Sequence, residues 1–218
     1  MLLEANNIKM NFIRKRNSTN ILEVINDLNL EINQGQIIII KGESGKGKTT
    51  IINILSGLLK PVSGNVLFND IDIYSLNDKK LSELRFNNFG IIPQGQTLLK
   101  GLSVIDNILL PLKLYRSIKD SDIIKAKELL TLVGINDLEN VLPKEMSGGE
   151  LRRASIARSL INNPKIIFAD EPTNDLDKKN RMQVIEIFKN CRQNGISIIM
   201  VTHDDSILDI GDKIIDLD

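Results

Sequence analysis

The sequence is poor in cysteine, histidine and aromatic residues. Among 218 residues there are one cysteine, one histidine and no tryptophan, and aromatic residues make up 4%. The single cysteine, Cys191, excludes a disulfide within the chain, which fits a reducing compartment. So few cysteine and histidine residues also argue against a structural zinc site, which is built from several such ligands. We therefore expect Cys191 to be an inert residue on a helix.

An excess of charge and a long apolar run are also missing. The chain has 28 basic and 28 acidic residues, so we expect no nucleic acid partner on electrostatic grounds. Its longest apolar clusters, such as residues 37–40, have the length of a strand and fall far short of the roughly 18 residues that cross a bilayer. The first residues do not have the pattern of a signal peptide. If a membrane is involved, we expect another chain to span it.

The hydrophobic pattern predicts an α/β fold. Hydrophobic residues make up 42% of the chain, enough for the core of one globular domain. Short apolar runs alternate with helical patterns, including a helix over 49–59, which predicts a mostly parallel sheet covered by helices. Residues 1–40 instead alternate like antiparallel strands, with an exposed turn over 14–20. Residues 101–145 have helical spacing without a strand between, which predicts a helical insertion.

A glycine-rich segment after the strand at 37–40 matches G-x-x-x-x-G-K-[ST], the phosphate loop of nucleotide-binding proteins. Its glycines let backbone N–H groups surround phosphate oxygens, and the following helix start favours negative charge. Lys48 is expected to reach the β- and γ-phosphates, and the Thr49 hydroxyl to bind Mg²⁺. The predicted ATP-binding residues of this segment are Gly42, Glu43, Ser44, Gly45, Lys46, Gly47, Lys48, Thr49 and Thr50.

Polar residues follow three other apolar strands. Asp170 and Glu171 end one strand, His203 follows another, and Gln94 follows a third. Because open α/β sheets bind ligands beyond the carboxyl ends of their strands, Asp170 could hold Mg²⁺ and Glu171 could accept a proton from attacking water. Taken alone, the carboxylates could be solvated charges, the histidine structural and the glutamine a surface residue. Beside a phosphate loop, a functional role is favoured for His203.

A second predicted helix start, at residues 147–150, contains two glycines that need an explanation. Ser147 and Glu150 have the spacing of a capping box, in which each side chain satisfies the backbone N–H of the other. A capping box does not explain the two glycines between them, since glycine disfavours helix. Gly148 and Gly149 would instead permit a close approach to the backbone.

These segments together resemble the nucleotide-binding subunit of ATP-binding cassette (ABC) transporters, over nearly the whole chain. The matching motifs, in the order of the family, are GESGKGKTT, MSGGELRRASIARSL, IIFADE, PTNDLD and VTHD. The resemblance implies a P-loop NTPase (RecA-like) core with an N-terminal antiparallel β-subdomain and an inserted α-helical subdomain. It implies one ABC ATPase domain over 1–218, with the antiparallel and RecA-like parts in 1–95 and 160–218 and the helical signature subdomain in 96–159.

The resemblance also assigns roles. In the family, two subunits pair head to tail, and each ATP lies between the phosphate loop of one and the signature helix of the other. It therefore implies that Phe12 stacks on adenine, that Gln94 helps Thr49 and Asp170 surround Mg²⁺, and that Lys48, Glu171 and His203 are catalytic. Asp175 and Asp177 would lie in a loop facing the partner subunit. The residues expected to contact the partner's ATP are Ser147, Gly148, Gly149 and Glu150.

Three positions depart from the commonest family pattern. Met146 stands for Leu, Glu150 for Gln, and Phe12 for the usual Tyr. A glutamate beside phosphate could repel it, but Glu150 can turn toward the helix cap instead.

The closest resemblance within the family is to a bacterial branch whose members release lipoproteins, export macrolides or antimicrobial peptides, or signal in cell division. It implies a homodimer on the cytoplasmic face of the cell membrane, which binds ATP and Mg²⁺ and drives an integral membrane permease docked near Gln94 and the helical insertion. Two alternatives are an ATPase that drives a membrane signalling partner without transport, and a soluble non-transport ABC ATPase. The transported substrate would meet the permease and is not encoded here.

Overall fold

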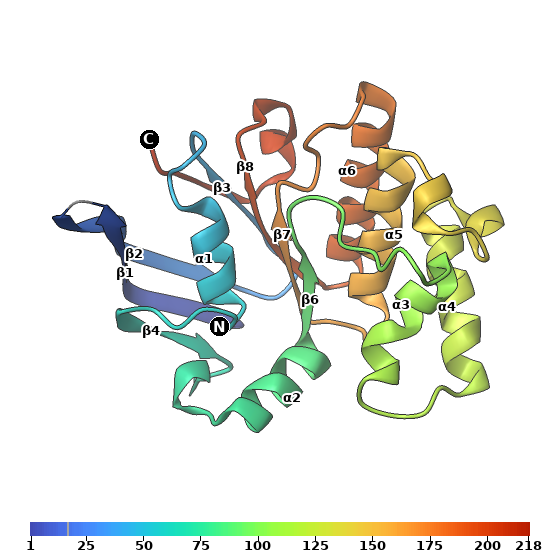
Figure 1. The fold of residues 1–218 in the computed structure, drawn as a ribbon, viewed down its shortest axis with the longest axis horizontal. Coiled ribbons are helices and arrows are strands. Elements are labelled where there is room, and N and C mark those ends of the chain that lie inside the picture. The colour runs from blue at the N-terminus through green and yellow to red at the C-terminus, as the bar shows by residue number, and fades with distance from the viewer. Residues whose placement is uncertain (17) are drawn as a thin grey trace.

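A computed structural model describes residues 1–16 and 18–218, with the side chains of 14–16 and 18–20 left undescribed. The described part has two sheets with helices around them (Figure 1). The first sheet is antiparallel, and its strands have the order β2-β1-β4-β5. Its strands are β1 (Leu3–Arg16), β2 (Ser18–Ile32), β4 (Ser63–Phe68) and β5 (Ile71–Asp72).

The second sheet is parallel and carries the phosphate loop. Its strand order is β6-β7-β8-β3-β9, so that β3 lies between β8 and β9. The phosphate loop follows β3 directly and leads into helix α1 (Lys48–Leu55). The strands are β3 (Ile37–Lys41), β6 (Phe89–Ile92), β7 (Ile166–Asp170), β8 (Ser197–Thr202) and β9 (Lys213–Asp216).

Most of the remaining helices follow β6. Helices α3, α4 and α5 come between β6 and β7 in the chain and lie together at the end of the molecule opposite the antiparallel sheet (Figure 1). The α-helices are α2 (Asp78–Asn88), α3 (Val104–Lys113), α4 (Asp120–Leu132), α5 (Gly148–Leu160) and α6 (Lys178–Gln193). The 3₁₀ helices are η1 (Ile73–Ser75), η2 (Asn136–Leu138), η3 (Pro143–Glu145) and η4 (Asp205–Ile210).

The parallel sheet separates two hydrophobic cores. In β3, Ile37 and Ile39 pack into the core shared with helices α3 to α6, while Ile38 and Ile40 pack into the core shared with α1 and the antiparallel sheet. Successive side chains of a strand point to opposite faces, so a continuous apolar run is what a sheet covered on both faces requires. The predicted α/β P-loop fold with an antiparallel β-subdomain is therefore confirmed; the boundaries 96 and 159 remain a prediction.

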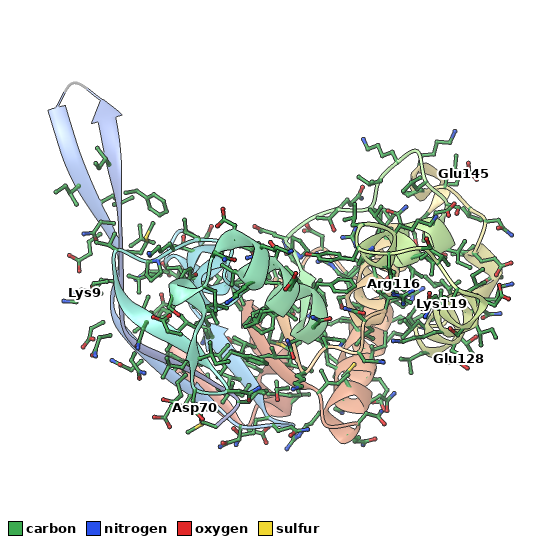
Figure 2. The ribbon with its side chains drawn as sticks, turned by 90° about the horizontal axis from the view of Figure 1, so that it is seen from below. Lys9, Asp70, Arg116, Lys119, Glu128 and Glu145 are labelled. Atoms are coloured by element: carbon green, nitrogen blue, oxygen red, sulfur yellow. The ribbon has the colours of Figure 1, made fainter. Side chains whose placement is uncertain are left out.

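Strands β1 and β2 form a hairpin that projects from the body, far from the end where Arg116, Lys119, Glu128 and Glu145 lie (Figure 2). The exposed turn predicted over 14–20 is too long, because β1 continues to Arg16 and β2 begins at Ser18. Asn17 lies outside the described residues.

Helix α1 is shorter than the predicted range 49–59. It ends at Leu55, and Gly57 follows with a φ of +72°. Glycine takes this left-handed conformation without strain and commonly ends helices in this way. The terminating residue is therefore Gly57 and not Pro61.

None of the helices in the described part of the chain has both the length and the apolar character needed to cross a membrane.

Candidate functional site

The phosphate loop, the end of β6 and the end of β7 border one cavity of about 300 Å³. It gathers residues that are far apart in the chain, and most of them belong to the predicted ATP-binding set. The lining residues are Phe12, Val24, Ser44, Gly45, Gly47, Lys48, Thr49, Thr50, Gln94 and Glu171.

The loop backbone depends on glycine. Gly45 and Gly47 have φ values of +89° and +84°, in the left-handed region that favours glycine. A Cβ on Gly47 would also lie 2.6 Å from Val24 Cγ1. Val24 of β2 therefore packs against the loop and lines the cavity, a role that the sequence did not suggest.

The Lys48 side chain lies under the loop and is 7% exposed. Its Nζ donates hydrogen bonds to the carbonyl oxygens of Gly42 (2.6 Å) and Glu43 (2.9 Å). It also lies 3.4 Å from Glu171 Oε1. The ammonium group is thus held beside the cavity by neutral carbonyls and one carboxylate.

Three predicted loop residues, Gly42, Glu43 and Lys46, are not among those that line the cavity. The Glu43 backbone N–H donates to Asp218 Oδ1 (3.2 Å), and Lys46 Nζ lies 3.5 Å from the same oxygen. A Cβ on Gly42 would lie 3.1 Å from Leu217 Cβ. Residues 217–218 thus support the outer side of the loop.

Glu171 joins two of the predicted catalytic residues. Its Oε1 lies 3.0 Å from His203 Nδ1, in addition to the contact with Lys48, and its Oε2 accepts the His203 backbone N–H (3.4 Å). The Glu171 side chain is 6% exposed and the His203 side chain 54%. Glu171 has a φ of +48°, unusual for a residue other than glycine, and such conformations cluster at functional sites. Strand ends β7 and β8 therefore bring together a buried carboxylate and an accessible imidazole.

Asp170 is 3% exposed, and its Oδ1 has no hydrogen-bond partner among the residues that the structure describes. Burial raises the pKa of the Asp170 carboxyl, and a hydrogen bond with the Thr49 side chain acts in the opposite direction. Within the described residues there is no group of three or more Asp, Glu, His or Cys that could hold a metal ion. A magnesium ion in a nucleotide site needs only one or two protein oxygens besides the phosphates. The orphaned Asp170 oxygen beside Thr49 fits such an ion.

The segment that carries Gln94 is held at both ends by helix α5. Arg152 Nη1 donates to the Pro93 carbonyl (3.1 Å), and Arg158 donates to the Thr97 carbonyl (2.8 Å) and to Thr97 Oγ1 (2.7 Å). Arg152 is 8% exposed. Neither arginine is predictable from the sequence, because their partners include backbone carbonyls about 60 residues earlier in the chain.

The second predicted anion site lies at the start of α5, away from the cavity. Ser147 Oγ accepts the Glu150 N–H (3.4 Å), and the Ser147 N–H donates to Glu150 Oε2 (2.7 Å), which confirms the capping box. These bonds with Ser147 lower the pKa of the Glu150 carboxyl. Ser147 and Gly148 are exposed and Gly149 is buried. Both hydrogen bonds of the capping box are therefore made within the chain, and the exposed side of the helix start remains accessible.

The predicted dimer loop leads into helix α6. Asp175 has a φ of +59°, and Asp177 is the N-cap of α6, where its Oδ1 accepts the Asn180 N–H (2.8 Å). Asp177 Oδ2 also accepts from Asn180 Nδ2 (2.9 Å). Asp177 therefore has an internal structural role in addition to the predicted place in a loop facing a partner.

Several known proteins are similar to this chain. The family model described as "ABC transporter" matches residues 25–174. The ABC transporter ATP-binding protein YtrE of Bacillus subtilis is 37% identical over 213 residues, covering 96% of this chain and 92% of YtrE. The putative hemin import ATP-binding protein HrtA of Staphylococcus epidermidis is 38% identical, covering 100% and 96%.

One similar relative is much longer than this chain. The macrolide export ATP-binding/permease protein MacB of Campylobacter fetus is 37% identical over 99% of this chain, which covers 33% of MacB. Among solved structures, the dimeric post-hydrolysis state of the ATP-binding cassette MJ0796 bound to ADP and Pi matches with a TM-score of 0.90 at 30% identity. That match covers 99% of this chain and 94% of the other.

Proposed function

The chain belongs to the ABC transporter family and is an ATPase domain of it, and from this premise we propose that it forms an ATP-dependent dimer that drives an integral membrane permease. The observation that carries the proposal is the cavity in which the phosphate loop, Gln94 and Glu171 meet. The exposed cap at Ser147, which the chain's own cavity does not use, supports the dimer.

Within one subunit, the residues of the cavity have separate tasks. The loop N–H groups would hold the triphosphate, and Lys48 would transfer its contacts from the carbonyls of Gly42 and Glu43 to the phosphate oxygens. Phe12 would stack on adenine. Glu171 would accept the proton of the attacking water, and His203 would orient Glu171 and support the γ-phosphate.

Thr49, Gln94 and Asp170 would hold Mg²⁺, some of them through water. The bound ion would neutralise charge on the β- and γ-phosphates. Asp170 is suited to this task because its buried Oδ1 has no other partner.

Across the dimer, Ser147, the backbone of Gly148 and Gly149, and the first turn of α5 would contact the γ-phosphate bound by the partner. Asp175 and Asp177 would lie in the loop between the subunits. Loss of the γ-phosphate would remove these contacts and open the interface. We also propose that residues 96–159 form a helical subdomain distinct from 1–95 and 160–218.

Mixing two inactive variants tests this arrangement. Lys48→Ala disables the phosphate loop of a subunit. Ser147→Ala disables the start of α5, which the subunit contributes to the ATP site of its partner. Each variant alone should hydrolyse ATP poorly, whereas a mixture should regain activity from dimers with one complete site. If ATP-loaded protein stays monomeric and the mixture regains nothing, the proposed dimer is wrong.

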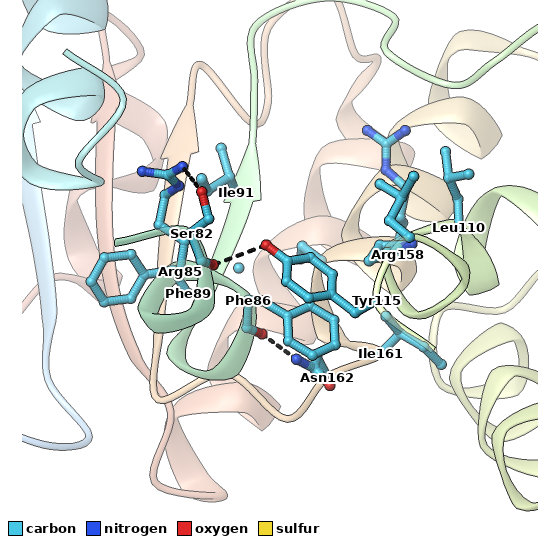
Figure 3. Close-up of a pocket in the computed structure, with 14 residues that line it drawn as sticks. Ser82, Arg85, Phe86, Phe89, Ile91, Leu110, Tyr115, Arg158, Ile161 and Asn162 are labelled. Atoms are coloured by element: carbon cyan, nitrogen blue, oxygen red, sulfur yellow. Dashed lines mark hydrogen bonds between the residues drawn. The ribbon is translucent and has the colours of Figure 1, made fainter. Parts of the chain in front are cut away.

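A groove of about 320 Å³ between α2, β6, α3 and α5 is the surface we propose for the permease (Figure 3). Phe86 and Tyr115 stack in it with ring centroids 3.9 Å apart. The Tyr115 hydroxyl donates to the Ser82 carbonyl (3.1 Å), and Asn162 donates to the Phe86 carbonyl. Exposed Leu114 at its edge, 74% accessible, adds apolar surface that the fold itself does not cover.

Gln94 itself lines the nucleotide cavity, whereas the helical insertion contributes Leu110 and Leu114 to this groove. The two sites are nevertheless connected. Ile91 of β6 and Arg158 line the groove, and the segment held by Arg158 contains Gln94.

We propose export or extraction of a lipoprotein, peptide or drug as the task of the complete transporter, at the cytoplasmic face of the cell membrane. A relative named for macrolide export supports this direction, whereas one named for hemin import would be consistent with uptake. The alternatives are an ATPase that drives a membrane signalling or cell-division partner without transport, and a soluble non-transport ABC ATPase.

Two measurements separate these classes. Purification in detergent after expression from the native operon should bring down an integral membrane protein, and its absence would favour the soluble ATPase. Vesicles containing the complex should then move a compound when ATP is added. ATP turnover without movement of any compound would favour the signalling role.

A further inference from the structure

The amide side chain of Asn180 connects the predicted dimer loop with the helix that begins at Ser147. Its Nδ2 donates to Asp177 Oδ2 (2.9 Å), and its Oδ1 accepts from Arg153 Nη1 of α5 (2.6 Å). The same Arg153 nitrogen donates to Gln183 Oε1 (2.7 Å). Arg153 is 7% exposed, whereas Asp177 and Gln183 are exposed, so the network runs from a buried guanidinium to the surface.

Gly149 completes the contact. A Cβ at this position would overlap the carboxamide of Asn180. At Gly148, by contrast, a Cβ would meet no atom of the described residues within 4 Å. The two adjacent glycines therefore differ: Gly149 is required by the packing of α5 on Asn180, and Gly148 leaves the outer face of the helix start open.

We propose that Asn180 is a positioning residue, which fixes the start of helix α5 relative to the dimer loop so that Ser147 meets the nucleotide of the partner subunit. The proposal rests on the proposed function, since it assigns Asn180 to the site of the partner and not to the site of its own chain. Loss of a hydrogen bond to a buried charged group, here Arg153, is expected to lower the rate of hydrolysis by about tenfold or more.

The test uses a mixed dimer with one complete ATP site. One subunit carries Lys48→Ala and contributes only its α5 start; the other carries Ser147→Ala and contributes only its phosphate loop. Asn180→Ala is then added to either subunit. In the Lys48→Ala subunit it should lower kcat about tenfold, with a smaller change in KM for ATP. In the Ser147→Ala subunit it should leave kcat close to that of the parent mixed dimer.

This comparison distinguishes positioning from general damage. Gln193→Ala removes an exposed amide at the other end of α6 and should have no effect in either subunit. Equal losses from both placements of Asn180→Ala, or no loss from either, would overturn the proposal. An inactive parent mixed dimer would instead refute the shared site and, with it, the proposed function.

A second experiment tests why residue 149 is glycine. Gly149→Ala, placed in the Lys48→Ala subunit, should lower kcat because its methyl group displaces Asn180. When Asn180→Ala is already present in that subunit, Gly149→Ala should cause little further loss. If Gly149→Ala lowers kcat by the same factor in both backgrounds, the glycine serves the nucleotide directly and Asn180 does not position the helix.

Discussion

The substitution Glu171→Gln distinguishes two roles of the buried carboxylate: the counter-charge of Lys48 and the proposed general base. Glu171 Oε1 and Lys48 Nζ lie 3.4 Å apart, and the side chains are 6% and 7% exposed. At this distance the gross attraction is about 5 kcal/mol for an effective dielectric constant near 20. Removing one partner of such a pair costs about 3–5 kcal/mol, because the other charge is left buried.

We expect a value near the lower limit for nucleotide-free protein, since Lys48 keeps its bonds to Gly42 and Glu43. A loss of about 3 kcal/mol corresponds to a fall in Tm of about 6–12 °C for a chain of this size. A bound triphosphate would supply a new counter-charge to Lys48. The Tm difference between wild type and variant should therefore shrink with ATP.

Hydrolysis should respond differently. Loss of a general base lowers kcat by a factor of about 10²–10⁴, equivalent to about 3–5 kcal/mol in the activation free energy. Differential scanning fluorimetry with and without a non-hydrolysable ATP analogue, together with phosphate release, measures both effects. Wild-type turnover by the variant would exclude Glu171 as the base. A Tm difference unchanged by nucleotide would show that Lys48 does not exchange Glu171 for phosphate.

Three further predictions concern the body of the protein. The Arg116 guanidinium holds the pKa of the Asp122 carboxyl below its ordinary 3.8, so its contribution to stability is present above that value and is lost as the pH falls through the folded-state pKa. Thermal melts of Asp122→Asn and wild type should therefore differ at neutral pH and converge in acid; a constant difference would refute the ion pair. Phe168 is fully buried and meets Phe89 edge to face, so Phe168→Ala should lower the free energy of unfolding in urea by about 3–5 kcal/mol, and Phe168→Leu by less. Burial raises the pKa of the Cys191 thiol to about 12, so a thiol reagent should modify it only in denaturant; rapid labelling of native protein would contradict this.

The sequence was most informative where one local pattern determines both geometry and chemistry. The phosphate loop is such a case, because glycine spacing, the preceding apolar strand and the following helix all lie within residues 37–55. The acidic pair Asp170 and Glu171 was found for the same reason, at the end of a continuous apolar strand. The capping box at Ser147 was likewise readable from the sequence alone.

Contacts between distant segments were not predictable in this way. The contact between Asn180 and Arg153 gives no local signal, since Arg153 lies on α5, 27 residues earlier in the chain. The two glycines before Glu150 look equivalent in the sequence, and only packing against Asn180 separates Gly149 from Gly148. The sequence does not mark Gly57 as the end of helix α1, because the following Leu58 and Leu59 continue the apolar pattern.

Strand β3 is enclosed on every side: β8 and β9 flank it, and a hydrophobic core covers each face. Deleting a single residue within Ile37–Lys41 would have one of two effects. Either every side chain before the deletion would move to the opposite face of the sheet, or the glycine segment would shift toward the sheet by about 3.3 Å. The length of this strand therefore determines the distance of the phosphate-binding backbone from the sheet.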